Sequence, residues 1–350
     1  MLIYSYILAA FTAIIVALLT TPLAIKIGNR FGAKSSSRDI EIERAPVPYL
    51  GGFAVIFSIF VAIIAAFLIY RNPFLGYNKA MIAIFAGTAV MFVVGYIDDR
   101  YDLRAGTKFI VQIIVALITA LLGVKISTIS NPFNSVFDLG ALSIPITVLW
   151  IVGITNAVNF VDGLDGLATG VLAIASISLA MICISLNLPF LAIIFLAVFG
   201  GTAGFLCFNY PPARIILGNN GAYALGFIFA TASIVQPVKV STAMVLFVPI
   251  LALGFPVMEI VITVARRLFK RKKVYQRDTE HLHHLLLSFG LPPSVVDWIF
   301  YSTSFLFATV AVVLSVGNRS LMIVFLVGLL IIFSILTVKL ASLERRKERR

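Results

Sequence analysis

The chain contains 350 residues, of which 61% are hydrophobic and 12% are charged, and its mean hydropathy is +1.06. This composition excludes a water-soluble domain and an intrinsically disordered chain, and it indicates a protein that crosses a membrane several times. The formal net charge of +12 is high enough for a nucleic-acid partner, so the positions of the basic residues have to be considered.

Apolar segments long enough to cross a bilayer recur along the whole chain. A transmembrane helix needs about 20 mostly apolar residues. We therefore predict an all-α, polytopic membrane protein of about 11 transmembrane helices, folded as a single domain over residues 1–350. The spans are expected at 3–27, 50–70, 79–97, 108–124, 141–158, 167–186, 188–208, 221–236, 240–264, 296–316 and 319–340. Only residues 187–189 separate the sixth span from the seventh, and the first span lacks the features of a cleaved signal peptide.

The basic residues are concentrated in alternate loops. With the N-terminus outside and the C-terminus cytoplasmic, 22 of the 27 lysine and arginine residues are cytoplasmic, at 26–44, 100–108, 214, 266–277 and 339–350. Cytoplasmic loops of membrane proteins carry this excess, and anionic lipid attracts it. No pattern of basic and aromatic residues indicates a nucleic-acid groove, so we predict anionic lipid as a partner and no nucleic acid.

The acidic residues also favour one side of the membrane, since only Asp138 of the fifteen falls in an outside loop. Asp98 and Asp99 end the third span. Adjacent carboxylates repel each other unless a cation is present, and together they form a hard oxygen site that suits Mg²⁺. The alternative is an ordinary solvated helix end.

Four polar residues recur at three-residue spacing where the fifth span ends: Asn156, Asn159, Asp162 and Asp165. An aspartate at hydrocarbon depth costs about 2.5–3.5 kcal/mol on insertion scales, so acids near spans usually mark function. The glycines that follow favour a turn that brings backbone amides close to a ligand. Polar residues that merely end a span would explain one of the four, not all of them.

The eighth span opens with Gly218, Asn219, Asn220 and Gly221. A glycine-containing turn before a helix N-terminus can bind phosphate through its free N–H groups, although asparagine and glycine also cap many ordinary helices.

All three histidines, His281, His283 and His284, follow the basic run 266–277. Three ligands so close in sequence rarely complete a tetrahedral zinc shell, and recognition of a diphosphate together with Arg277 fits better. We assign residues 265–295 as a cytoplasmic basic and histidine-containing loop within the single domain.

Five segments, in this order along the chain, resemble the motifs of the polyprenyl-phosphate N-acetylhexosamine-1-phosphate transferases, which are of glycosyltransferase 4 type. They lie at 46–52, 95–103, 156–168, 204–226 and 277–284. The His281-Leu-His283-His284 form is similar to the branch that transfers N-acetylglucosamine-1-phosphate to undecaprenyl phosphate.

The resemblance implies a phosphoglycosyltransferase of the bacterial inner membrane, with its active site on the cytoplasmic face. Such an enzyme moves the sugar-1-phosphate of a UDP-sugar, here UDP-N-acetylglucosamine, to undecaprenyl phosphate and releases UMP. This step initiates a cell-envelope glycan such as lipopolysaccharide O-antigen or teichoic acid. The resemblance implies Mg²⁺ as cofactor, with Mn²⁺ as an alternative ion, and it is compatible with a homodimer.

The resemblance also implies a role for each matching residue. Asp98 is expected to act as a base on the lipid phosphate, and Asp99 as a metal ligand or positioning group. The expected catalytic residues are Asp98, Asp99 and Asp162, the expected metal ligands are Asp99, Asp162 and Asn219, and the expected substrate-binding residues are Asn156, Asn159, Asp165, Arg277, His281, His283 and His284.

Two departures from the family pattern bear on activity. Asn219 stands where the family has an aspartate, and a neutral carbonyl oxygen holds Mg²⁺ more weakly. Residues 40–43 replace a usual basic stretch that contains a histidine. The alternative function is therefore an inactive homologue that binds lipid or nucleotide without turnover. A transporter is disfavoured, because only Glu259 approaches the midplane depth where transporters bind their substrates.

Overall fold

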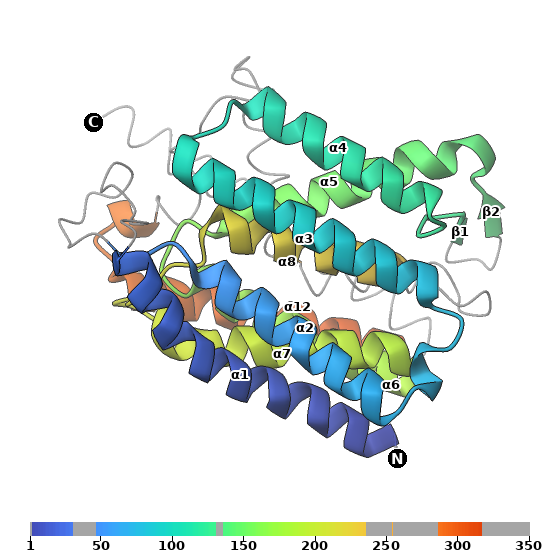
Figure 1. Cartoon of the computed structure of the whole chain (residues 1–350), viewed down its shortest axis with the longest axis horizontal. Coiled ribbons are helices and arrows are strands. Elements are labelled where there is room, and N and C mark those ends of the chain that lie inside the picture. The colour runs from blue at the N-terminus through green and yellow to red at the C-terminus, as the bar shows by residue number, and fades with distance from the viewer. Residues whose placement is uncertain (1, 31–46, 131–135, 236–253, 255–285, 317–350) are drawn as a thin grey trace.

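The computed structural model describes residues 2–30, 47–130, 136–235, 254 and 286–316 (Figure 1). These residues are helical except for connecting turns and one small antiparallel hairpin, and the all-α prediction is confirmed. The helices are α1 (Leu2–Arg30), α2 (Gly51–Ile69), α3 (Asn78–Tyr101), α4 (Ala105–Leu121), α5 (Ser143–Val161), α6 (Leu167–Ser185), α7 (Pro189–Asn209), α8 (Gly218–Ile234) and α12 (Pro293–Val316). Short 3-10 turns, η1 (Asn72–Phe74) and η2 (Gly140–Leu142), precede α3 and α5, and the hairpin pairs β1 (Thr128–Ser130) with β2 (Val136–Asp138).

Nine of the predicted spans coincide with these helices; of the spans predicted at 240–264 and 319–340, only residue 254 is among the described residues. The short division between the sixth and seventh spans is confirmed. Asn187 adopts a left-handed conformation with φ 55°, and Pro189 occupies the first turn of α7. Both features suit a sharp end to one helix and the start of the next, because asparagine tolerates positive φ and proline lacks the N–H that a helix start does not use.

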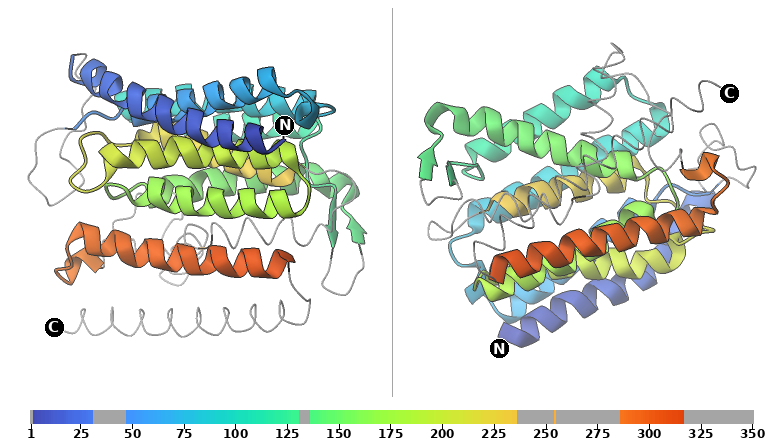
Figure 2. Two further views of the ribbon diagram at one scale, coloured as in Figure 1. Left: turned by 90° about the horizontal axis from the view of Figure 1, so that it is seen from below. Right: turned by 180° about the vertical axis from the view of Figure 1, so that it is seen from behind.

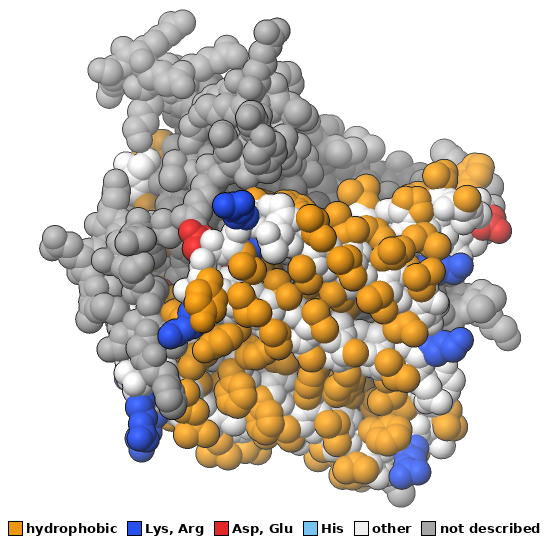
Figure 3. All heavy atoms as spheres, turned by 45° about the horizontal axis from the view of Figure 1, so that its top comes forward, with side chains coloured by type: hydrophobic (Ala, Val, Ile, Leu, Met, Phe, Trp, Pro, Cys, Tyr) orange, Lys and Arg blue, Asp and Glu red, His pale blue; other side chains and the backbone are white. Residues whose placement is uncertain are grey.

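Seven of the described helices are long and apolar enough to cross a membrane, whereas α4 and α8 have 17 residues each. Apolar side chains remain exposed around the bundle. On α4 they are Phe109, Ile110, Ile113, Ile114, Leu117, Ile118 and Leu121. Figure 3 shows such side chains covering most of one face, with Lys and Arg near its margins. A surface of this kind is stable in lipid and not in water, so the chain is an integral membrane protein.

The short helix α8 lies at the centre of the bundle. It packs against α2, α3 and α5, while α7 packs against α1, α2 and α6, and α12 covers α6 (Figures 1 and 2). Every residue of α8 except Asn219 is buried. Its amino-terminal turn therefore reaches the polar end of the bundle while surrounded by other helices.

One end of the bundle gathers the functional candidates, and we call it the site end. The helices α1, α3, α5 and α7 finish there, and α2, α4, α6, α8 and α12 begin there (Figure 1). Backbone hydrogen bonds join the first residues of α2 to the segment just before α8: the N–H groups of Gly51 and Gly52 donate to the carbonyls of Ile216 and Leu217 over 3.1 and 2.9 Å. The starts of α2 and α8 are thus fixed to each other.

Candidate functional site

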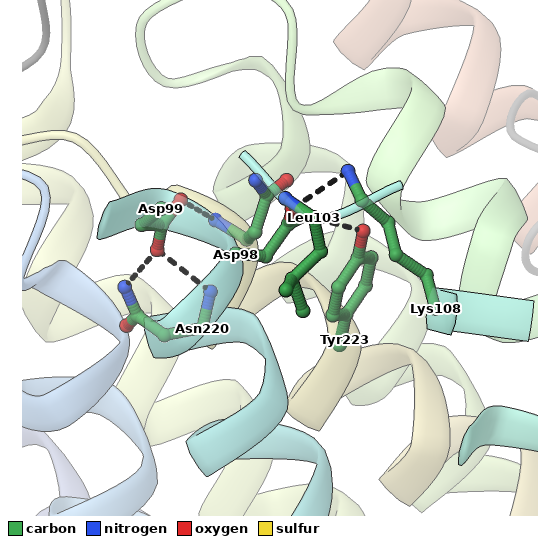
Figure 4. Close-up of polar contacts among 7 residues, drawn as sticks. Asp98, Asp99, Leu103, Lys108, Asn220 and Tyr223 are labelled. Carbon is green, nitrogen blue, oxygen red and sulfur yellow. Dashed lines mark hydrogen bonds and ion pairs between the residues drawn. The ribbon is translucent and has the colours of Figure 1, made fainter. Parts of the chain in front are cut away.

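Asp98 lies at the end of α3 and is only 3% exposed, yet its carboxylate has three hydrogen-bond or ion-pair partners (Figure 4). Oδ1 lies 2.7 Å from Nζ of Lys108 and accepts the backbone N–H of Leu103 over 3.0 Å. Oδ2 accepts the hydroxyl of Tyr223 over 2.9 Å. A buried carboxylate needs such partners, because an unpaired charge in a low-dielectric environment is strongly unfavourable.

Asp99, the next residue, faces the first turn of α8 instead. Its Oδ1 accepts the N–H of Asn219 over 2.9 Å, and its Oδ2 accepts the N–H of Asn220 over 3.1 Å and the side-chain amide of Asn220 over 2.6 Å. The amide of Asn220 also donates to the carbonyl of Tyr49 over 2.7 Å. The N–H groups at this helix start, where the sequence predicted a phosphate site, thus donate to the chain's own Asp99, because helix N-termini offer unpaired N–H groups and a positive dipole end.

Glycines allow α3, α8 and the start of α2 to come this close. A Cβ atom at Gly95 would overlap the backbone of Asn219 and Asn220, and one at Gly52 would overlap Asn220 and Gly221. Gly218 has φ 77°, a conformation that glycine adopts without strain. The chain turns there into α8 with its amides directed at Asp99.

The asparagines of α5 have different surroundings. The side-chain amide of Asn156 donates to Oε1 of Gln112 on α4 over 2.6 Å and to the carbonyl of Val152 over 2.7 Å. Nε2 of the fully buried Gln112 has no hydrogen-bond partner within the described part of the chain. Asn159 is half-buried, and its backbone carbonyl accepts the N–H of Asp162 over 3.3 Å. Asn156 thus joins α5 to α4, a role that its motif alone did not reveal.

Asp162 follows the last residue of α5. Desolvation raises the pKa of its carboxyl group well above the usual range, and the negative charges of Asp99 and Asp165 raise it further. The backbone N–H of Gly218 acts in the opposite direction by favouring the charged form. Asp162 therefore lies close to Asp99 and to Gly218 at the start of α8, so the three residues can belong to one site.

We expect Asp162→Asn to stabilise the cation-free protein near neutral pH. Near pH 4 an unfolded aspartate is about half-protonated, so the folded state, in which Asp162 keeps its proton, loses little stability relative to the unfolded state. As the pH rises, the unfolded state releases the proton while burial opposes its release from the folded state, so the wild type loses stability relative to the variant. Thermal unfolding in detergent with a chelator should give a Tm difference that is small near pH 4 and favours the variant near pH 8. A constant difference would contradict this assignment.

Asp165 fixes the loop that follows α7. Its Oδ2 accepts the N–H of Ala213 over 3.0 Å. Asn209, the last residue of α7, accepts the N–H of Gly166 over 3.1 Å and the hydroxyl of Thr169 over 2.7 Å, and donates to the carbonyl of Ile215 over 2.9 Å. These bonds tie the motif at 162–168 to the segment that leads into α8.

The structure therefore brings most of the predicted site residues to one end of the bundle. Asp98, Asp99, Asp162, Asp165, Asn156, Asn159 and Asn219 all belong to helix termini or turns at the site end. Arg277, His281, His283 and His284 lie outside the described residues. Of the predicted loop 265–295, only 286–295 is described, and α12 begins within it at Pro293.

Four contact residues were missed in the sequence: Lys108, Gln112, Tyr223 and Asn209. Lys108 and Gln112 lie four residues apart on α4, a spacing that puts both on one helix face, and this signal was available. Tyr223 and Asn209 lie within a segment that resembled the family, but nothing in their spacing indicated their partners.

Carboxylate and amide oxygens, the ligand types that a hard divalent cation prefers, occur at this end. No group of three or more His, Cys, Asp or Glu side chains in a metal-binding arrangement occurs among residues 2–30, 47–130, 136–235 and 286–316. However, the negative charges of Asp99 and Asp165 both act on Asp162, and a cation bound there would relieve this repulsion. Asp98 is already paired with Lys108, so Asp99 and Asp162 are the better candidate ligands.

The fold and the site define an integral membrane protein with an acid-rich polar site at one end of its helix bundle. The model of glycosyl transferase family 4 matches residues 81–236. A probable undecaprenyl-phosphate N-acetylglucosaminyl 1-phosphate transferase of Bacillus subtilis is 31% identical over 342 residues, which are 97% of this chain and 93% of the relative. A decaprenyl-phosphate N-acetylglucosaminephosphotransferase of Mycobacterium leprae is 30% identical, over 81% of this chain and 77% of the relative.

A phospho-N-acetylmuramoyl-pentapeptide-transferase of Staphylococcus epidermidis is 29% identical, over 80% of this chain and 91% of the relative. The chain belongs to the polyprenyl-phosphate N-acetylhexosamine-1-phosphate transferases of glycosyl transferase family 4.

Proposed function

We propose that this protein transfers N-acetylglucosamine-1-phosphate from UDP-N-acetylglucosamine to undecaprenyl phosphate and releases UMP. One observation carries the proposal: carboxylates from the ends of α3 and α5 gather with Lys108 at the start of α8. Transfer between two phosphates needs charge neutralisation and in-line positioning more than covalent chemistry. A cluster of fixed opposite charges at a membrane end supplies both.

Lys108 is the described residue best placed to bind a phosphate oxygen. Its side chain is 22% exposed, while the carboxylate that holds it is buried. Because the ammonium group is already held in place, binding a phosphate does not require the Lys108 side chain to lose further conformational entropy. Lys108 would therefore bind the lipid phosphate or the diphosphate of the donor and stabilise charge that develops during transfer.

Asp98 contributes mainly by holding Lys108. Both oxygens of its carboxylate are already engaged, Oδ1 by Lys108 and the N–H of Leu103 and Oδ2 by the hydroxyl of Tyr223. A phosphate monoester is mostly doubly ionised at neutral pH, since its second pKa is about 6. In this proposal Asp98 accepts a proton from the lipid phosphate only when that phosphate still carries one.

Mg²⁺, or Mn²⁺ in its place, would be held by Asp99 and Asp162, with the amide oxygen of Asn219 as a weaker ligand. When bound, such an ion neutralises phosphate charge and orients the two substrates. Asp165, Asn156 and Asn159 would contact the donor nucleotide from the same end, and Arg277 with the three histidines would hold the sugar-diphosphate.

The choice of N-acetylglucosamine rests on the histidine pattern and on the names of the relatives from Bacillus and Mycobacterium. We place the protein in the bacterial inner membrane with the site end in the cytoplasm, because UDP-sugars are cytoplasmic and described basic residues border this end. They are Lys26, Arg30, Arg100, Arg104, Lys108 and Arg214. The product would initiate a cell-envelope glycan such as O-antigen or teichoic acid. We also propose that the protein binds anionic lipid and forms a homodimer.

The test is UMP release by the purified full-length protein with undecaprenyl phosphate and Mg²⁺, measured across several UDP-sugars. We expect UDP-N-acetylglucosamine to give the highest rate and a chelator to abolish it. Failure to release UMP from any UDP-sugar, even by the Asn219→Asp variant, would remove the proposal.

The inactive homologue is kept as a second candidate because of the start of α8. Both asparagines there donate hydrogen bonds to Asp99, and Asn219 offers no charge to a cation. Ordinary turnover by the chain as written would eliminate this candidate. Binding of UDP-N-acetylglucosamine without UMP release would support it.

We expect Asn219→Asp to tighten Mg²⁺ binding by about tenfold, because a charged oxygen ligand replaces a neutral one. Calorimetric titration of Mg²⁺ into the detergent-solubilised protein measures this directly. Asp138→Asn, at an exposed position of the hairpin at the opposite end, is the control and should leave the affinity unchanged. Equal affinity of the wild type and Asn219→Asp would show that residue 219 is not a ligand.

A further inference from the structure

The phenol of Tyr223 lies against the buried side of Asp98. Tyr223 is 2% exposed, and its hydroxyl donates to Oδ2 of Asp98 over 2.9 Å (Figure 4). This is the only hydrogen bond to Oδ2 found among the described residues, whereas Oδ1 has both Lys108 and the N–H of Leu103. The two oxygens of one carboxylate thus serve different helices: Oδ2 faces α8 and Oδ1 faces α4.

A carboxylate with all its partners on one oxygen is poorly fixed, because partial rotation about the Cβ–Cγ bond tilts the plane of the carboxylate at little cost. The hydroxyl of Tyr223 opposes this rotation, since turning Asp98 would break its bond and leave a buried hydroxyl unpaired. The same bond therefore determines where Oδ1, and with it the ammonium group of Lys108, is held.

We propose that Tyr223 is a positioning residue that orients the Asp98 carboxylate so that Lys108 is held toward the reacting phosphates. The inference rests on the proposed transferase function. Tyr223 itself is buried and acts only through Asp98. Its aromatic ring also packs in the core, so a useful test has to separate the ring from the hydroxyl.

Tyr223→Phe makes that separation, because it keeps the ring and removes the hydroxyl. We expect kcat for UMP release to fall by about tenfold or more, since displacement of a reacting group by a fraction of an ångström has effects of this order. The KM for UDP-N-acetylglucosamine should stay within about twofold of the wild-type value, because a slightly misplaced Lys108 loses more contact with the charge that develops in the transition state than with the bound donor.

A double-mutant cycle with Lys108→Met distinguishes positioning from a general loss of packing. If Tyr223 acts through Asp98 on Lys108, removing its hydroxyl from the Lys108→Met protein should change kcat by less than about twofold. The matched control is Tyr301→Phe, which removes another buried phenol hydroxyl, one that donates to the carbonyl of Gly166 over 2.8 Å. Its effect should be the same with and without Lys108.

A Tyr223→Phe protein with wild-type kcat, or effects of Tyr223→Phe and Lys108→Met that multiply, would overturn the inference. If the wild type releases no UMP, the proposed function fails, and the same cycle is then measured on the thermal unfolding midpoint. Non-additive shifts for the Tyr223 and Lys108 variants would support a coupling through Asp98, and additive shifts would refute it.

Discussion

Replacing Lys108 with methionine is expected to lower UMP release by about 10² to 10³-fold, the usual effect of removing one preorganised group that stabilises transition-state charge. Methionine keeps the apolar length of the side chain and removes the ammonium group. The change also leaves Asp98 as a buried carboxylate without its counter-ion, so some loss of stability should accompany the loss of activity.

Two controls separate these effects. Lys125→Met changes the same type of residue just beyond the far end of α4, where the side chain is exposed, and should behave as wild type. Lys108→Met combined with Asp98→Asn removes both charges and should recover part of the lost Tm without recovering activity. An active Lys108→Met enzyme would show that the phosphates bind elsewhere.

Gly95→Ala should be among the most damaging single substitutions in the described helices. The added methyl group would overlap the backbone of Asn219 and Asn220, which cannot move aside as a flexible side chain could. Overpacking of this kind costs about 1–3 kcal/mol, and more when backbone has to shift. Separating α3 from α8 would also stretch the hydrogen bonds from α8 to Asp99, so activity should fall together with Tm.

Gly153→Ala provides the matched control, because a Cβ atom there meets no other atom within 4 Å. It also replaces a helical glycine with alanine, and it should leave Tm unchanged or slightly raised. Thermal unfolding in detergent and UMP release measure both variants. Equal stability of Gly95→Ala and the wild type would contradict the close approach of α3 and α8.

The sequence predicted the spans and the common end of the acids well, because hydrophobic length and charge placement are local properties. Nine predicted spans match described helices, and Asn187 with Pro189 marked a real boundary. Local patterns do not determine which helix faces meet. Asp98 and Asp99 are adjacent in sequence, yet one faces Lys108 and Tyr223 while the other faces the start of α8.

The polar residues inside apolar helices were the hardest to interpret. Tyr223 looks like an ordinary core residue, since its neighbours along α8 are alanine, leucine and glycine. Its partner lies 125 residues earlier in the chain. Asn156 was assigned to substrate binding from its motif, and its hydrogen bond to Gln112 depends on how α4 and α5 pack, which spacing along α5 does not reveal.

The partners of the Asp98 carboxylate come from distant segments of the chain, so they are synthesised at different times. Membrane insertion follows translation, so Asp98 leaves the ribosome shortly before Lys108 and long before Tyr223. Until α8 has been inserted, Asp99 also lacks the three N–H donors that surround it in the finished protein. Water at the membrane surface has to solvate both acids during this interval. A nascent chain that stalls before α8 would therefore hold Asp98, Asp99, Lys108 and Asp162 and still have no assembled site.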